Sequence, residues 1–351
     1  MKILYITDIV PKFTGGPANA VPPRILAQSK VDDVFWLNIN DYFEWQNDSF
    51  KFDFGSEWQN KSLDDIPFEP DIIVFQGVLS WVRSSKYPKD ARKKSIPYVV
   101  LPHSQLNFKA RDMNNLFKFI GTPKQFEVFV YHAKAVQFFT EEQKAESVYF
   151  GAPTIIIPNG VQEQKFIRRT LKDKISAMFI GRVVPQKGLD IFINACTPIK
   201  DFLREKNFFL DIYGSNSSSL KEQIDSAELQ DIIHLHNPIF GVEKDTAFKN
   251  ANLFILPSRY EGQPVALLEA LSYSLPVLTT TAANMTEVIS SAKVGLVASP
   301  SVESIRQNLI DLLNDIAFAY PNMANSAYQL SKKYFWSKIA LDTHNIYKKL
   351  I

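Results

Sequence analysis

The chain has 351 residues, which is enough for two domains of ordinary size that each bury a core. Its formal net charge of +2 argues against nucleic acid as a main partner, and its composition is that of a globular protein. The single cysteine, Cys196, excludes an internal disulfide and falls on the apolar face of a predicted helix. No apolar run approaches the length of a membrane span, and we expect an intracellular protein.

Short apolar segments alternate with amphipathic segments from the start of the chain. This alternation predicts parallel sheets built from strand-helix-strand units. Turn residues break the pattern at Pro158, Asn159 and Gly160, and a polar stretch follows. We therefore expect a first Rossmann-like domain over residues 1–158, with strands at 3–6, 34–37, 72–75, 98–101, 135–139 and 154–157.

The second half of the chain repeats this pattern and ends in a helix predicted over residues 336–350. It predicts a second Rossmann-like domain over 159–335, so the fold class is α/β. The strands expected here are 175–180, 208–213, 232–235, 253–256, 277–280 and 296–298. Because open parallel sheets bind ligands beyond the carboxyl ends of their strands, the loops that follow the strands are the candidate sites.

Two loops of the first domain carry candidate residues. After strand 3–6, Gly15 and Gly16 would let the backbone approach a phosphate closely, although a plain turn is the alternative. The loop lacks the GxGxxG pattern of a nicotinamide oxidoreductase. After strand 98–101, Pro102 is followed by His103, and a lone histidine is more often structural than catalytic.

The first loop of the second domain follows strand 175–180 and carries two cations. Arg182 comes after Gly181, and Lys187 precedes Gly188 at the start of a helix. An arginine can meet phosphate oxygens with two parallel hydrogen bonds, while a lysine acts as a mobile point charge. The loop therefore suits a phosphate group, with solvated charges beside a turn as the alternative.

The loop after strand 253–256 places two carboxylates around a helix start. Glu261 falls in the loop, Pro264 suits the first turn of the helix, and Glu269 falls on the second turn. Backbone N–H groups at Gly262, Gln263 and the helix start would attract an anion, and carboxylates can accept hydrogen bonds from sugar hydroxyls. A nucleotide sugar carries both groups, although either glutamate alone could simply complement the helix dipole.

The span from Glu261 to Glu269 resembles the E-x7-E signature of retaining glycosyltransferases of the GT-B fold, in particular glycosyltransferase family 4. Gly181-Arg182 with Gln186-Lys187-Gly188-Leu189 is similar to the second signature of that family. Pro102-His103 resembles its Pro-His-Gly, with Ser104 in place of the glycine. The resemblance implies two Rossmann-like domains that face an interdomain cleft, with helix 336–351 packed back on an acceptor-binding N-terminal domain.

The resemblance also implies roles for individual residues. The two cations would grip the donor diphosphate, Glu269 would hold the ribose hydroxyls, and Glu261 and His103 would reach the sugar. The residues expected to bind the donor are Gly16, Arg182, Lys187, Glu261, Gly262, Gln263, Pro264 and Glu269. Those expected to act in catalysis are Glu261, His103, Arg182 and Lys187.

The function that follows is transfer of a hexose-type sugar from a UDP- or GDP-sugar to a hydroxyl of a glycan or lipid-linked saccharide. The resemblance implies retention at the anomeric carbon and a role in cell-surface polysaccharide, lipopolysaccharide or capsule biosynthesis. We expect no metal or other cofactor, because no DxD-like or His/Cys cluster with ligand geometry stands out in the sequence. The alternatives are an inverting GT-B transferase, a nucleotide-sugar hydrolase or epimerase, and a non-catalytic partner subunit.

Two basic segments of the first domain could contact an anionic membrane surface at the inner membrane face. An exposed loop and a helix with one buried face are an equally good explanation. The first segment holds Arg83, Lys86, Lys89, Arg92, Lys93 and Lys94, and the second holds Phe108, Lys109, Arg111, Leu116, Phe117, Lys118 and Phe119.

Overall fold

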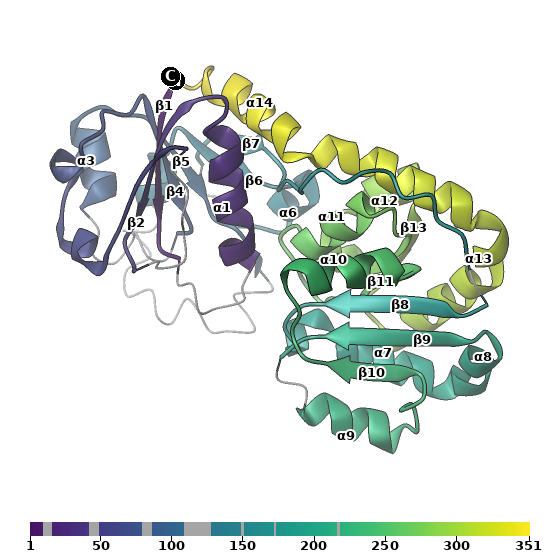
Figure 1. Ribbon diagram of the computed structural model, residues 1–351. Helices are drawn as coiled ribbons and strands as arrows, with labels where there is room; N and C mark the ends of the chain where they lie inside the picture. Colours follow the sequence, from purple (N-terminus) through teal and green to yellow (C-terminus); the bar gives the residue numbers. More distant parts are fainter. Residues whose placement is uncertain are drawn as a thin grey trace. The chain divides into compact units, whose positions relative to one another are not determined.

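The computed structural model describes residues 1–9, 16–41, 49–78, 86–108, 128–148, 151–171, 173–215 and 218–351. The chain divides into two units, one formed by Met1–Gly160 with Trp336–Ile351 and the other by Val161–Phe335. Each unit is built on one parallel sheet with helices around it (Figure 1). The predicted fold class of two parallel-sheet α/β domains is therefore confirmed.

The sheet of the first unit has the order β3-β2-β1-β4-β5-β6-β7. Its central strands are buried on both faces, which explains why they appear in the sequence as unbroken apolar runs. The strands are β1 (Lys2–Thr7), β2 (Asp33–Asn38), β3 (Lys51–Phe54), β4 (Ile72–Gln76), β5 (Tyr98–Leu101), β6 (Ala135–Phe138) and β7 (Thr154–Ile156).

The C-terminal helix packs within the first unit. Its residues Trp336, Ile339 and Ala340 share a core cluster with strands of that sheet. Gln28 Nε2 donates a hydrogen bond to the Ala340 carbonyl at 3.1 Å, and Tyr347 Oη donates to Gln137 Oε1 at 2.6 Å. The described helices of this unit are α1 (Gly16–Gln28), α3 (Tyr87–Lys93), α6 (Glu141–Ala145) and α14 (Trp336–Tyr347), with 3₁₀ turns at Ser56–Asn60 and Leu63–Asp65.

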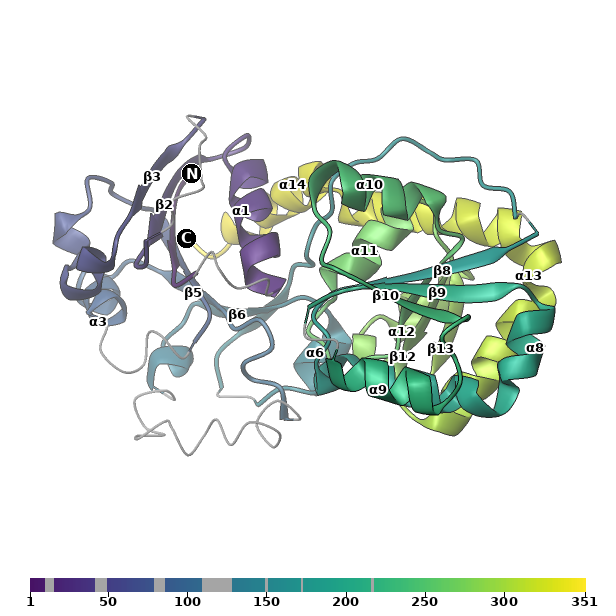
Figure 2. The same cartoon turned by 60° about the horizontal axis from the view of Figure 1, so that its bottom comes forward.

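The sheet of the second unit has the order β10-β9-β8-β11-β12-β13, and strands β8, β9 and β10 run side by side (Figure 2). Its strands are β8 (Ile175–Ile180), β9 (Phe208–Tyr213), β10 (Ile233–His236), β11 (Leu253–Leu256), β12 (Val277–Thr280) and β13 (Gly295–Ala298). Its helices are α7 (Leu189–Cys196), α8 (Lys200–Glu205), α9 (Ser218–Ser226), α10 (Gly241–Asn250), α11 (Val265–Ser272), α12 (Thr286–Ala292) and α13 (Val302–Ser331), and short 3₁₀ turns lie at Pro185–Lys187, Thr197–Ile199, Thr281–Ala283 and Lys332–Tyr334.

Two local expectations need correction. Strand β3 was not predicted from the sequence, because its four residues contain no apolar run and lie on an exposed edge of the sheet. Pro264 does not lie in the first turn of a helix, since α11 begins at Val265. Pro264 is the residue before the helix, with extended backbone at φ −75° and ψ 117°, where a missing N–H is equally harmless.

The predicted membrane-contact segments are described only in part, since Arg83 and residues 109–119 lie outside the described residues. In the described part, α3 carries Lys89, Arg92 and Lys93, and the adjacent Lys94 forms an ion pair with Asp64. Within the described ranges, none of the helices combines the length and the apolar character that a membrane span requires.

Candidate functional site

The loop between β11 and α11 holds Glu261 in a buried position, with 6% of the residue exposed. Its Oε1 accepts hydrogen bonds from Ser258 Oγ at 2.7 Å and from Lys187 Nζ at 2.5 Å. The cation and the hydroxyl compensate for the burial of the carboxylate. The structure thereby brings together Glu261 and Lys187, which the sequence placed in two separate motifs.

The backbone of the same loop is held by Asn284, a residue that follows β12. Asn284 adopts a left-handed conformation at φ +57°, which asparagine tolerates better than most residues. Its Nδ2 donates to the carbonyl oxygen of Glu261 at 2.8 Å and of Gly262 at 3.2 Å. Gly262, Gln263 and Pro264 are buried here, so these predicted donor-binding residues all lie in the loop that leads into α11.

The loop between β8 and α7 approaches the Glu261 loop closely. Gly188 has φ +65°, and a Cβ atom at this position would lie 2.0 Å from the Pro257 carbonyl oxygen. Only glycine fits both the conformation and the contact. Lys187 directly precedes this glycine, whereas Arg182 lies at the start of the loop and is exposed. The close approach of the two loops is what places Lys187 beside Glu261.

A second ion pair fastens the two loops together. Arg259 donates from Nη1 and Nη2 to the two carboxylate oxygens of Asp190 at 2.7 and 2.6 Å, and from Nη1 to the Pro185 carbonyl at 2.6 Å. These hydrogen bonds, with the positive charge of Arg259, hold the pKa of the Asp190 carboxyl below its ordinary value. Gln186 adds a bond from Nε2 to the Tyr260 carbonyl at 3.0 Å. This pair could not be seen in the sequence, because its members lie 69 positions apart in loops that meet only after folding.

Glu269 lies on the second turn of α11, as the helical spacing predicted. Its Oε1 accepts a hydrogen bond from Lys244 Nζ on α10 at 2.7 Å. Lys244 was not expected here, because it belongs to none of the sequence motifs. In the described part of the chain, the contacts of both glutamate carboxylates fall on Oε1, so Oε2 is the atom that can accept a ligand hydroxyl.

His103 lies in the first unit, where only Pro102 separates it from the end of β5. Its backbone is left-handed at φ +53°, so the unusual conformation falls on the histidine and not on Ser104. Its ring Nε2 lies 3.0 Å from Gln76 Oε1 and acts as the donor in this hydrogen bond. Burial, together with the positive charge of Arg24, lowers the pKa of His103 to about 3. The imidazole is therefore neutral around pH 7.

Gly16, also in the first unit, is the first residue of α1, and none of the described residues lies within 4 Å of the place where a Cβ atom would be. A phosphate could reach the backbone at such a helix start. Gly15, its neighbour in the predicted loop, lies outside the described residues.

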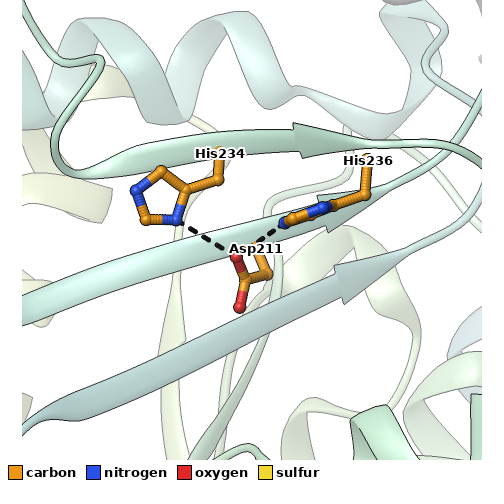
Figure 3. Close-up of side chains that lie close together, drawn as sticks. All are labelled: Asp211, His234 and His236. Atoms are coloured by element: carbon orange, nitrogen blue, oxygen red, sulfur yellow. Dashed lines mark hydrogen bonds and ion pairs between the residues drawn. The ribbon is translucent and has the colours of Figure 1, made fainter.

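Among the described residues, one group of side chains that was not expected from the sequence could hold a metal ion. Asp211 on β9 and His234 and His236 on β10 lie close together in the second unit (Figure 3). None of these residues belongs to the Glu261 loop or the Lys187 loop. The spacing His-x-His is visible in the sequence, but the aspartate joins it only through the pairing of the two strands.

Comparison with known proteins supports a group 1 glycosyltransferase. The sequence model of the family Glycosyl transferases group 1 matches residues 160–330, which include Arg182, Lys187, Glu261 and Glu269. An uncharacterized glycosyltransferase of Methanocaldococcus jannaschii is 27% identical over 197 residues, which are 56% of this chain and 54% of that protein. The chain spans about half the length of the curated relatives it matches.

Solved structures of glycosyltransferases share the fold over almost the whole chain. HepE of Anabaena, solved in complex with UDP, has a TM-score of 0.75 at 13% identity and covers 99% of this chain and 100% of its own. WaaG, a glycosyltransferase involved in lipopolysaccharide biosynthesis, has a TM-score of 0.70 at 16% identity, with coverage of 98% and 99%. The fold is that of the GT-B glycosyltransferases.

Proposed function

We propose that this chain transfers a hexose-type sugar from a UDP- or GDP-sugar to a hydroxyl of a glycan or lipid-linked saccharide. The reaction retains the configuration at the anomeric carbon, as in glycosyltransferase family 4. The observation that carries the proposal is the buried contact of Lys187 with Glu261 at the start of α11. This contact supports the proposal because a lysine can bind phosphate oxygens and a carboxylate can accept a hydrogen bond from a sugar hydroxyl.

Charge on the departing diphosphate would be stabilised by groups that are already in place. Lys187 has three N–H donors and uses one on Glu261, so two can bind phosphate oxygens. Arg182 is exposed at the end of β8, and the start of α11 adds the positive end of a helix dipole. Such preorganised positive groups lower the barrier without proton transfer and without a metal ion.

The two glutamates would orient the donor. Glu261 Oε2 would accept a hydrogen bond from a hydroxyl of the sugar, and Glu269 Oε2 would accept one from the ribose. In the first unit, the neutral imidazole of His103 would contact the transferred sugar, and the Gly16 backbone would contact the donor phosphates. The UDP bound to HepE supports a nucleotide donor, and the role of WaaG supports a place in cell-surface polysaccharide assembly.

The acceptor and the membrane contact follow from the same proposal. A lipid-linked acceptor would bring the enzyme to the inner membrane face, where Lys89, Arg92 and Lys93 of α3 would meet anionic lipids. Sedimentation with vesicles that contain phosphatidylglycerol tests this contact. Protein that stays in the supernatant at low salt contradicts it.

Donor binding is tested by thermal unfolding with UDP, GDP, ADP, CDP and their common sugar conjugates. We expect one nucleotide family to stabilise the protein, by about 2.7 kcal/mol when its concentration is 100 times Kd. Arg182→Ala and Glu269→Ala should each reduce this shift strongly. The matched control is Arg306→Ala, which removes an exposed ion pair with Glu303 on α13 of the same unit.

No stabilisation by any nucleotide contradicts the proposed donor. Once the donor is known, the anomeric configuration of the product can be read from its proton NMR spectrum. A product with inverted configuration contradicts the retaining reaction and leaves the donor assignment intact.

A further inference from the structure

Strand β10 is an edge strand of the second sheet and pairs in parallel with β9. The register places His234 opposite Asp211 and His236 opposite Tyr213. Because side chains alternate along a strand, Asp211, His234 and His236 all point to the same face of the sheet. Figure 3 shows both imidazole rings turned towards the Asp211 carboxylate.

The three side chains offer ligand atoms at close range. His234 Nδ1 lies 3.2 Å and His236 Nε2 lies 2.8 Å from the same oxygen, Oδ1 of Asp211. Each residue contributes one ligand atom, and these three atoms all lie within 4.8 Å of one another. Ligands of one Zn²⁺ ion lie about 2.0 to 2.2 Å from it, so three atoms this close to one another are candidates to share an ion.

Aromatic neighbours hold both rings in place. The ring of His236 stacks on Tyr213 with centroids 4.8 Å apart and an interplanar angle of 21°. The ring of His234 lies against Phe209, with centroids 5.7 Å apart. The histidine side chains are 39% and 41% exposed, and that of Asp211 is 19% exposed. The group is thus oriented by packing and still open to an ion from solvent.

We propose that Asp211, His234 and His236 form a binding site for a divalent first-row transition ion, of which Zn²⁺ fits best. Two imidazole nitrogens and one carboxylate oxygen are preferred ligands of Zn²⁺, whereas Mg²⁺ and Ca²⁺ favour oxygen alone. Each neutral imidazole would bind the ion through the nitrogen that faces Asp211 and carry its proton on the other ring nitrogen. Three protein ligands leave the remaining coordination position to water.

The ion fastens the edge strand to the sheet. It joins β10 to β9 near the carboxyl ends of these strands, where backbone hydrogen bonds also link neighbouring strands. Gly214 N donates to the His236 carbonyl at 3.2 Å, and Gly181 N donates to the Tyr213 carbonyl at 3.0 Å. A cavity of 610 Å³ lies beside the group, lined by Asp211 and Tyr213 and by residues of α10. The site uses none of the residues assigned to sugar transfer, so the metal site and the proposed function can be tested independently.

The test is calorimetric titration of the chelator-treated chain, purified without a polyhistidine tag, with ZnCl₂. We expect one ion per chain. His234→Gln and His236→Gln should each weaken binding on the order of 100-fold. His132→Gln, which removes an exposed histidine of the other unit, should leave binding unchanged. Zinc should also raise the melting temperature of the unaltered chain but not that of His236→Gln.

Cobalt provides a second readout that does not depend on stability. Co²⁺ bound at the site should give visible absorption bands, and these should be absent in the double variant His234→Gln/His236→Gln. Circular dichroism verifies that each variant is folded. The proposal is overturned if the unaltered chain binds no zinc, or if the double variant binds it equally well. Equal binding of Mg²⁺ overturns the assigned class of ion.

Discussion

Two loops that follow parallel strands hold their candidate residues by opposite means. In the second unit, the loop after β11 is fixed by charged groups, since Glu261 contacts Lys187 and Arg259 contacts Asp190. In the first unit, the loop after β5 is fixed by neutral groups. The His103 ring donates to Gln76 Oε1 at 3.0 Å, and the His103 carbonyl accepts from Gln143 Nε2 at 2.5 Å.

The difference matches what each loop is proposed to bind. A diphosphate carries negative charge, so the loop that meets it needs cations that are held in place before the ligand arrives. A sugar carries hydroxyl groups, which a neutral imidazole can contact without the desolvation of an ion. The comparison also predicts that the two loops respond differently to substitution, because removing one member of a buried charged pair leaves the other uncompensated.

The largest effect is expected from Lys187→Met, which removes the cation and keeps the apolar stem. Transfer should fall roughly 100- to 1,000-fold, because one preorganised group is lost from the leaving diphosphate. The free energy of unfolding should fall by about 1 to 3 kcal/mol, since Glu261 loses a charged partner. Initial rates with the identified donor, and circular dichroism for the fold, measure the two effects.

A matched control for this variant exists in the same unit. Lys200 also forms an ion pair with a glutamate, but its partner Glu228 has a side chain that is 75% exposed. Lys200→Met should therefore leave transfer unchanged and alter the stability little. If Lys187→Met turns over at the normal rate, Lys187 has no part in the reaction.

A smaller effect is expected from Arg259→Lys, which keeps the charge but loses the two parallel hydrogen bonds to Asp190. The free energy of unfolding should fall by about 1 kcal/mol. The affinity for the donor nucleotide should fall roughly tenfold, because the loops that carry Lys187 and Glu261 lose their link. Calorimetric titration measures the affinity, and urea unfolding measures the stability.

Arg204→Lys is the control for the geometry of this pair. Arg204 contacts both carboxylate oxygens of Asp231, at 2.8 and 3.1 Å, in an exposed position on α8. Its substitution should have a similar effect on stability and none on nucleotide affinity. Equal losses of affinity in the two variants would show that Arg259 does not position the site.

The fold could be predicted because each buried strand is an apolar run between turn residues. The strand at 253–256 is one such run, and its four residues form β11. The prediction missed β3, because an exposed edge strand needs no apolar run. It also misplaced Pro264 by one position, since proline fits both the first turn of a helix and the residue before it.

The candidate site could be predicted only where one short segment carries the pattern. Glu261 and Glu269 lie on one loop and helix, so their spacing is visible in the sequence. Lys244 and Arg259 could not be found in this way, because their partners come from other elements. Asp211 was missed for the same reason, since it reaches the two histidines only through strand pairing.

The last prediction concerns the neutral loop and changes only the pH dependence of stability. In the folded chain, burial lowers the pKa of His103 from 6.5 to about 3, with Arg24 of α1 adding to the shift. Between these two values the unfolded chain binds the additional proton, so stability falls as the pH falls. The slope from this group is at most about 1.4 kcal/mol per pH unit.

His103→Gln should remove this slope, because glutamine can keep a hydrogen bond to Gln76 but does not titrate. All five tryptophans belong to the first unit, so their fluorescence during urea unfolding reports on the unit that contains His103. From pH 7 to pH 4 the unaltered chain should lose stability faster than the variant does. Asp190 acts in the same direction in both proteins, because its lowered pKa means that acid breaks its pair with Arg259. Parallel pH profiles would mean that His103 is not held neutral by its surroundings.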